Sequence, residues 1–119
     1  MFSGRTFEDA VGRGAGAVDI HDVDCGKAPI RLTEIGGQGW YHIPYRILLP
    51  RGLDNLLVAG RCVSTDHVAS GTLRTQPSCM TTGQAAGTAA AIAAKEEIHP
   101  RDLEIRELQR VLTSQRVLI

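Results

Sequence analysis

The feature that most constrains this sequence is an uncharged run of small residues, which we predict to form one long helix over about residues 76–95. No charged residue occurs between residues 75 and 94, and alanine, glycine and threonine dominate the second half of the run. Its polar side chains are too numerous for a helix that faces lipid, so a membrane span is excluded. Pro77 suits the first turn of the helix, where its missing N–H group would have no intrahelical partner.

Within this helix Gly83, Gly87 and Ala91 recur every fourth residue and share one face. A glycine inside a helix costs roughly 1 kcal/mol against alanine. The pattern therefore favours close approach of a sheet, a second helix or a ligand on that face. Tight packing without any ligand explains the same spacing, because glycine spacing alone is weak evidence of a site. Both alternatives predict that leucine at Gly83 or Gly87 would overpack the contact.

A short apolar run at residues 55–59 precedes the helix and is followed by Gly60. Continuous apolar residues are typical of a strand covered on both faces, as in a parallel sheet. Gly60 would let a cofactor lie against the backbone where this strand ends. A strand that ends in glycine and leads to a glycine-bearing helix start often surrounds a cofactor phosphate or ring.

The first 17 residues are polar and rich in glycine, and we expect a loop or a weakly held helix start there. Residues 12–17 match a dinucleotide-binding glycine pattern with alanine in the last place. No apolar strand precedes the match and no helical periodicity follows it. The match therefore lacks the context that a phosphate-binding loop requires.

Residues 17–24 alternate apolar and polar side chains, which predicts a half-exposed strand followed by a turn. A metal site could be drawn from the ligand-type side chains of this region, Asp19, His21, Asp22 and Cys25. No second group of ligands completes the coordination. We therefore expect a solvated strand face and no metal site.

Residues 27–49 predict one or two strands with a flexible turn at the glycine-rich residues 36–39. Aromatic and β-branched side chains around Tyr41 favour a strand. Pro44 cannot donate to a sheet ladder, so the strand lies at an edge or ends there. The aromatic rings beside His42 and Arg46 suit a pocket wall as well as ordinary edge-strand packing.

Two further helices are expected downstream. A short one should run through Ser70 and end at Gly71, with Ser64 or Thr65 as its cap. Pro100 then separates the long helix from a final amphipathic helix. The apolar residues that share one side of this last helix are Leu103, Leu108, Val111 and Leu112.

Charge and cysteine usage narrow the possible functions. The 13 Lys and Arg residues balance the 13 Asp and Glu residues, so the formal net charge is zero. This balance argues against a dedicated binder of nucleic acid or of an anionic membrane. The three cysteines, Cys25, Cys62 and Cys79, form no CxxC pair and are expected to be reduced thiols, which suggests a cytoplasmic protein.

Several motifs follow one another along most of the chain: residues 19–21 (Asp-Ile-His), 43–46 (Ile-Pro-Tyr-Arg), 55–64, 67–69, Arg74 and 83–87 (Gly-Gln-Ala-Ala-Gly). In this order they resemble the C-terminal part of FAD-dependent oxidoreductases in which a substrate domain interrupts a Rossmann-type FAD domain. The series is specific, whereas no single motif is. The resemblance implies an α/β fold class: a C-terminal fragment of an FAD/NAD(P)-binding Rossmann-like fold, with substrate-domain strands, a long Ala/Gly-rich helix and a C-terminal amphipathic helix.

The resemblance also implies an organisation into parts. Residues 1–49 would be loop and strands at the end of the substrate domain, residues 50–97 the last portion of the FAD-binding domain, and residues 98–119 a C-terminal helix. The family's opening strand, glycine-rich turn and acidic ribose ligand have no counterpart in these 119 residues. We therefore expect the chain to need a partner that supplies these elements, either the missing N-terminal segment or another subunit. Alone, the chain should bind FAD weakly or not at all. Its exposed apolar faces should also make it self-associate.

Flavin chemistry is the activity that the resemblance implies, with a hydride passing between FAD and a small substrate. Cofactor contacts are expected at two places, the turn after the strand at residues 55–59 and a helix N-terminus near residues 82–84. The amides of that N-terminus would stabilise negative charge on the reduced flavin. The expected contact residues are Gly60, Arg61, Ser64, Thr82, Gly83, Gln84 and Ala85. Two candidate catalytic residues are His67, which can shuttle a proton, and Arg74, which can hold a carboxylate or oxyanion. The expected substrate pocket comprises His21, His42, Tyr45 and Arg46.

Plainer interpretations of these residues stay open. His67 without a partner can be a surface or capping histidine, and Arg74 can form a salt bridge or bind a loop carbonyl. Many related flavoproteins have an acid at the position of Arg61, where a guanidinium would instead contact a phosphate. For the whole chain, the alternative to part of an oxidoreductase is a non-catalytic packing or assembly module whose small-residue helix is a protein interface.

Overall fold

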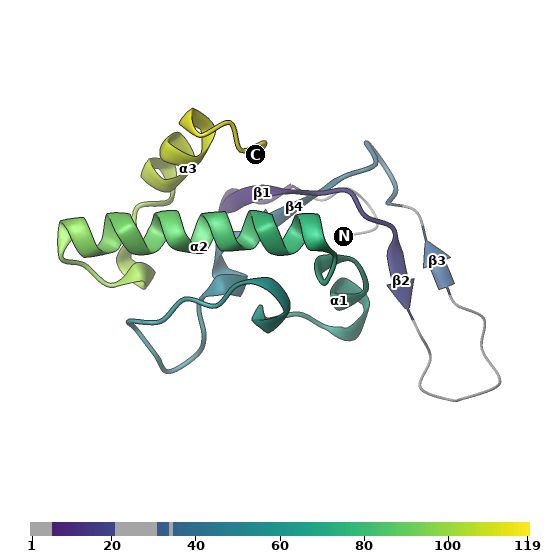
Figure 1. Cartoon of the computed structure of the whole chain (residues 1–119), viewed down its shortest axis with the longest axis horizontal. Helices are drawn as coiled ribbons and strands as arrows, with labels where there is room; N and C mark the ends of the chain where they lie inside the picture. The colour runs from purple at the N-terminus through teal and green to yellow at the C-terminus, as the bar shows by residue number, and fades with distance from the viewer. Residues whose placement is uncertain (1–5, 21–30, 34) are drawn as a thin grey trace.

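The computed structural model describes residues 6–20, 31–33 and 35–119, and these residues form an α/β fold. The strands come first: β1 (Ala10–Gly14), β2 (Val18–Ile20), β3 (Arg31–Thr33) and β4 (Tyr41–Pro44). The helices follow: α1 (His67–Leu73), α2 (Gln76–Glu96) and α3 (Ile105–Ser114) (Figure 1). Short 3-10 helices are η1 (Tyr45–Leu48), η2 (Gly60–Cys62) and η3 (Pro100–Asp102). The α/β class predicted from the sequence is confirmed.

The strands form an interrupted antiparallel ribbon. β1 pairs with β4 and β2 pairs with β3, so the chain runs outward along β1 and β2 and returns along β3 and β4 (Figure 1). The predicted turn at residues 36–39 is present, because the Gly39 N–H donates to the Gly36 carbonyl. β4 ends at Pro44, as its missing donor predicts. β2 likewise confirms the strand expected within residues 17–24.

The prediction of a loop or helix start at the N-terminus is wrong for residues 10–14, which form β1. Glycines concealed this strand because they lower β propensity. A Cβ atom on Gly12 would overlap the Thr81 methyl group, and one on Gly14 would overlap the Tyr41 ring. The glycine pattern at residues 12–17 therefore serves close packing of a strand against α2 and β4, and not a phosphate-binding loop.

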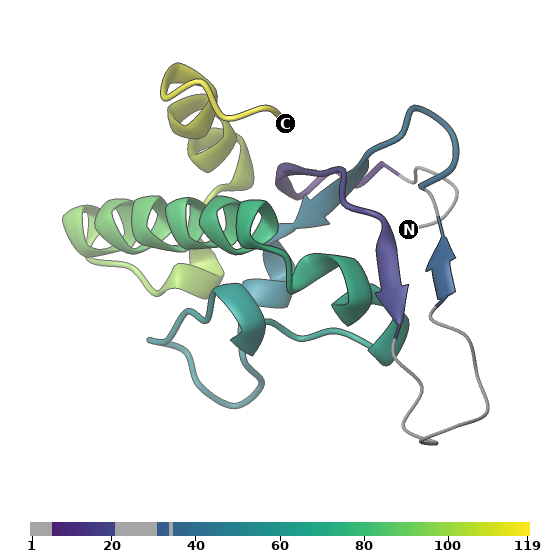
Figure 2. The same cartoon turned by 45° about the vertical axis from the view of Figure 1, so that its right-hand side comes forward.

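The long helix predicted near residues 76–95 is confirmed by α2, which carries Pro77 in its first turn. Its buried face consists of small residues, which let the helix lie close against β1: Ser78, Thr82, Ala85, Ala89 and Ala93. α3 packs against both α2 and β1, and Figure 2 shows it lying along one side of α2. The core between these elements includes Val11, Ile43, Leu108 and Leu112, which are fully buried.

The close approach predicted at Gly83 and Gly87 is not observed. The two glycines share a face as expected, but a Cβ atom added at either one would meet nothing within 4 Å. The α-helix turns by about 100° per residue, so these glycines point away from the buried side at Ala85 and Ala89. The expectation that leucine would overpack either position is therefore wrong for contacts within the described residues.

Residues 56–59 form neither a helix nor a strand, and none of the described strands pairs with residues 55–59, so the predicted strand is wrong. The Val58 N–H donates to the Leu48 carbonyl, which fixes the segment beside η1. Leu56 is 44% exposed, so the run is not covered on both faces. An apolar run forms a strand only where a neighbour completes its hydrogen-bond ladder, and the described strands pair among themselves.

The two smaller helices differ from prediction in detail. Asp66 caps α1 by accepting the Ala69 N–H at 2.7 Å, in place of Ser64 or Thr65. The helix then continues past Gly71 to Leu73. The amphipathic helix expected after Pro100 is α3, whose Leu108 and Leu112 are buried. No helix in the part of the chain that the structure describes is long and apolar enough to span a bilayer.

Candidate functional site

Two adjoining hollows beside the start of α2 bring together three of the residues predicted to carry function. One, of about 210 Å³, is lined by Asp19, Ile20, His67, Ser70, Gly71 and Arg74. The other, of about 400 Å³, is lined by Asp19, Arg61, Gly71, Arg74, Thr75, Gln76 and Pro77. Because they share Asp19, Gly71 and Arg74, we treat them as one site and call it the Arg74 hollow. His67, Arg74 and Arg61 all lie around it.

Arg74 is held in place by β2 and α1. It follows the last residue of α1, and its Nη2 donates to a carboxylate oxygen of Asp19 at 2.8 Å. Gly71 permits this approach, since a Cβ atom there would stand 2.9 Å from the Asp19 carbonyl oxygen. The side chains of Arg74 and Asp19 are 43% and 34% exposed. The salt bridge considered for Arg74 is therefore present, and the guanidinium keeps donors that a ligand in the hollow can use.

Arg61 and the first turn of α2 add positive charge to the Arg74 hollow. Arg61 lies in η2, next to Gly60, whose φ of 65° favours glycine. The Gly60 N–H donates to the Thr82 hydroxyl at 2.9 Å, which fixes η2 against α2. Thr75 precedes α2, and its side chain does not cap the first amides of the helix. Among the described residues, the lining contains two guanidinium groups and one carboxylate, a charge balance that suits an anionic ligand.

The helix N-terminus predicted near Thr82, Gly83 and Gln84 is wrong, because α2 already begins at Gln76. The amides of these residues lie inside the helix. The Thr82 side chain is buried, accepts the Gly60 N–H and lies 3.0 Å from the Ser78 carbonyl oxygen. Gln84 instead donates to Gln115 near α3, and Ala85 is part of the core. The structure therefore separates the predicted cofactor residues over different faces of α2.

Ser64 and His42 line another hollow, of about 220 Å³, next to Phe7 and Asp66. The His42 Nδ1 accepts the Phe7 N–H at 3.1 Å, so the neutral ring carries its proton on Nε2. Trp40 stacks on the imidazole with 5.0 Å between ring centroids. Burial, followed by the nearby charge of Arg13, lowers the pKa of His42. The imidazole is therefore held in its neutral form more firmly than a free histidine.

This shift predicts a specific loss of stability in mild acid. With the folded pKa of His42 below its ordinary 6.5, the unfolded chain binds this proton more readily. The stabilisation is complete above pH 6.5 and is lost as the pH falls through the lower, folded pKa. We expect the free energy of unfolding in urea to decrease from pH 7 to pH 5, and His42→Gln to flatten this decrease. The exposed His67→Gln variant is the control, and equal slopes for both variants would contradict the assignment.

Tyr45 and Arg46, both expected in a substrate pocket, connect separate elements. Tyr45 is 3% exposed and its hydroxyl donates to the Pro100 carbonyl at 2.8 Å. Burial raises the pKa of Tyr45 to about 12. Arg46 pairs with Asp9 at 2.6 Å, and its guanidinium lies 4.8 Å from the centre of the Phe7 ring. Neither residue lines the hollow beside His42.

His21 lies outside the described residues, as do Asp22 and Cys25 of the metal site considered above. Among the residues that are described, no group of three or more His, Cys, Asp or Glu side chains could hold a metal ion.

The comparison with protein-family models decides the family. The model described as FAD dependent oxidoreductase matches residues 1–112, which is most of the chain. The chain belongs to the FAD-dependent oxidoreductase family. Comparisons with curated proteins and with solved structures gave no match. The resemblance seen in the ordered motifs is thus confirmed, and FAD is the cofactor by which the family is defined.

In this FAD-dependent oxidoreductase chain, sequence analysis did not identify the partner of Arg74. In the sequence, Asp19 belongs to the Asp-Ile-His motif and to the metal site considered above, and neither pattern indicates a partner for Arg74. The two residues are 55 positions apart, and only the packing of α1 against β2 brings them together. Ser70 and Gly71 were expected to mark the end of a helix, and they line the Arg74 hollow instead.

Proposed function

We propose that this chain supplies flavin-side and substrate-side contacts to an FAD-dependent oxidoreductase that transfers a hydride between FAD and a small substrate. The observation that carries the proposal is the position of Arg74 in the lining of two adjoining hollows, one of which also includes His67 and the other Arg61 and the start of α2. A packing module, the alternative considered from the sequence, would account for the exposed glycine face of α2. It would not require two guanidinium groups beside a helix N-terminus.

The donor chemistry of the Arg74 hollow fits an anionic part of FAD. Arg61 is exposed and can form paired hydrogen bonds with a phosphate. The N–H groups at the start of α2 can stabilise negative charge, although Pro77 contributes none. When bound, FAD supplies the hydride acceptor or donor. Arg61 and Gln76 are therefore the residues that we assign to its anionic portion, together with the turn at Gly60.

On the substrate side, Arg74 and His67 are suited to an anionic molecule. The ion pair with Asp19 restrains the Arg74 guanidinium, so less side-chain freedom is lost when a carboxylate binds. His67 is exposed at the first position of α1 and lines the same hollow, and an imidazole is a common general acid or base in enzymes. We propose that Arg74 orients the substrate and that His67 exchanges a proton with it.

The cellular location of the chain and its association with a partner are also part of the proposal. We propose a cytoplasmic protein, supported by balanced charge and by the free thiols of Cys62 and Cys79. We also propose that residues 50–97 complete an FAD-binding domain together with another FAD-binding segment or a partner subunit. Exposed apolar side chains such as Leu53, Leu56 and Met80 support association with such a partner or with a second copy.

Flavin retention tests the proposed function. The chain would be mixed with the N-terminal FAD-binding segment of a family member, and bound flavin would be measured by its visible absorbance after gel filtration. Arg61→Gln and Arg74→Gln are expected to weaken retention about tenfold or more, because hydrogen bonds to charged groups contribute about 1.5–3 kcal/mol. Arg51→Gln, an exposed arginine on a turn, is the matched control. If Arg61→Gln and Arg74→Gln both retain as much flavin as Arg51→Gln, the assignment of the Arg74 hollow to flavin is refuted.

A further inference from the structure

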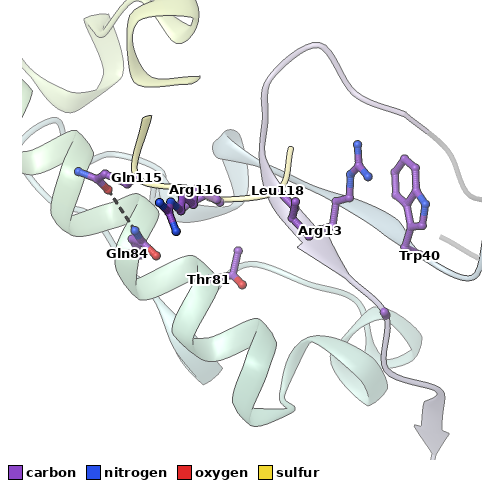
Figure 3. Close-up of a pocket in the computed structure, with 9 residues that line it drawn as sticks. Arg13, Trp40, Thr81, Gln84, Gln115, Arg116 and Leu118 are labelled. Atoms are coloured by element: carbon purple, nitrogen blue, oxygen red, sulfur yellow. Dashed lines mark hydrogen bonds between the residues drawn. The ribbon is translucent and has the colours of Figure 1, made fainter. Parts of the chain in front are cut away.

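A further cavity, of about 450 Å³, lies where β1, α2 and the segment after α3 meet. Figure 3 shows Arg13 and Trp40 on one side of it and Gln84, Gln115 and Arg116 on the other, with Thr81 between them. We call it the Arg116 pocket. It shares no lining residue with the Arg74 hollow. Its volume is within the range of small-molecule sites in proteins.

The described lining of the Arg116 pocket contains two arginines and no acidic residue. The guanidinium of Arg13 lies over the Trp40 ring, 4.0 Å from its centre. One Nη of Arg13 donates to the Ile119 main-chain oxygen at 2.5 Å, and its buried Nε has no hydrogen-bond partner among the described residues. The guanidinium is thus held in a fixed orientation by Trp40 and Ile119, and it adds positive charge beside the pocket.

Arg116 occupies a backbone position that usually belongs to glycine. Its φ is 66°, and the turn around it closes α3: the Arg116 N–H donates to the Thr113 carbonyl, and the Val117 N–H donates to the Leu112 carbonyl. Helix C-termini of this kind favour glycine at the left-handed residue because a side chain there is strained. An arginine at this position places a positive charge at the pocket at a cost in stability.

The rest of the lining suits an organic ligand body rather than a bare inorganic ion. Trp40, Val117 and Leu118 give the pocket apolar walls. Gln84 donates to Gln115 at 3.0 Å, which fixes both side chains and leaves the second half of each amide for other partners. Cations and apolar surface therefore lie within one cavity.

We propose that the Arg116 pocket binds a small organic anion, with its carboxylate or phosphate group at Arg116 and its apolar part against Trp40 and Leu118. This site is separate from the proposed flavin and substrate contacts in the Arg74 hollow, so either proposal can fail without the other.

Trp40 is the only tryptophan of the chain and reports on this pocket directly. The purified chain would be titrated with hexanoate and hexyl phosphate while its tryptophan emission is recorded. Inorganic phosphate tests the charge without the apolar part, and 1-hexanol tests the apolar part without the charge. A saturable emission change with hexanoate or hexyl phosphate, at least about tenfold tighter than with either control compound, is expected. No saturable change, or equal binding of 1-hexanol, would overturn the proposal.

Variants of Arg116 separate binding from folding. Arg116→Gln should weaken the better probe about tenfold or more, while Arg51→Gln, which removes an exposed charge elsewhere, should leave it unchanged. Arg116→Gly should also lose binding but melt no lower than the unmodified chain, because glycine is favoured at a φ of 66°. Unchanged probe affinity in both Arg116 variants would overturn the proposal.

Discussion

Gly14→Ala is expected to destabilise the chain by about 1–3 kcal/mol, the usual cost of forcing a side-chain group into a packed core. The new methyl group would overlap the ring of Tyr41, which is 1% exposed. The ring cannot easily move aside, because its hydroxyl is 2.9 Å from the Thr72 hydroxyl and 3.4 Å from that of Ser78. Gly14 therefore fixes the contact between β1, β4 and the start of α2.

Gly87→Ala is the matched control for this prediction, and its effect should have the opposite sign. Gly87 is an exposed helix position, and no atom of the described residues lies within 4 Å of an added Cβ atom. Alanine there should stabilise the chain by about 1 kcal/mol through helix propensity. Urea unfolding of the two variants would measure both changes. A stable Gly14→Ala variant would contradict the packing around Tyr41, and a destabilised Gly87→Ala variant would show that another surface covers this face of α2.

The elements that sequence predicted well are those specified by local signals. α2 follows from a charge-free run of helix-compatible residues with proline at its start. α3 follows from apolar residues at helical spacing, and the end of β4 follows from Pro44. Each signal acts within a few residues, so it does not depend on the tertiary fold.

The elements that sequence missed depend on distant partners. β1 is hidden by glycines whose purpose becomes visible only when Thr81 and Tyr41 are in place. Residues 55–59 have the composition of a buried strand, yet strand formation needs a neighbouring ladder. The exposure of the glycine face of α2 could not be predicted from the sequence either. Helical periodicity shows which residues share a face, but it does not show which face is buried.

The candidate site shows the same division. His67, Arg74 and Arg61 were selected from the chain by residue type and by resemblance, and the structure places them around one hollow. Asp19 orients Arg74 from 55 positions away, which no local pattern reveals. Arg116 gave no signal in the sequence, because its left-handed backbone conformation follows from the closing turn of α3.

The chain by itself is expected to bind FAD at least about a hundredfold more weakly than the chain mixed with a family member's N-terminal FAD-binding segment. The adenosine diphosphate half of FAD is normally held by a strand, a glycine-rich turn and a helix N-terminus, with an acid some 20 residues on. In the described residues, the glycine-rich stretch at residues 12–17 contributes to an antiparallel ribbon instead. The flavin contacts that we propose in the Arg74 hollow would reach one anionic part of the cofactor only.

Losing half of the contacts removes most of the affinity, while the entropic cost of ordering the cofactor stays. FAD would be titrated first with the purified chain, and then with a mixture of the chain and the separate FAD-binding segment. In both titrations, binding would be measured by the quenching of flavin fluorescence. That segment alone is the control, since it can bind the adenosine half without any help. Arg61→Gln should remove much of the gain on mixing, because Arg61 is the exposed guanidinium beside the first turn of α2. Tight binding by the chain alone would contradict the prediction, and a gain on mixing that is insensitive to Arg61→Gln would place the flavin elsewhere.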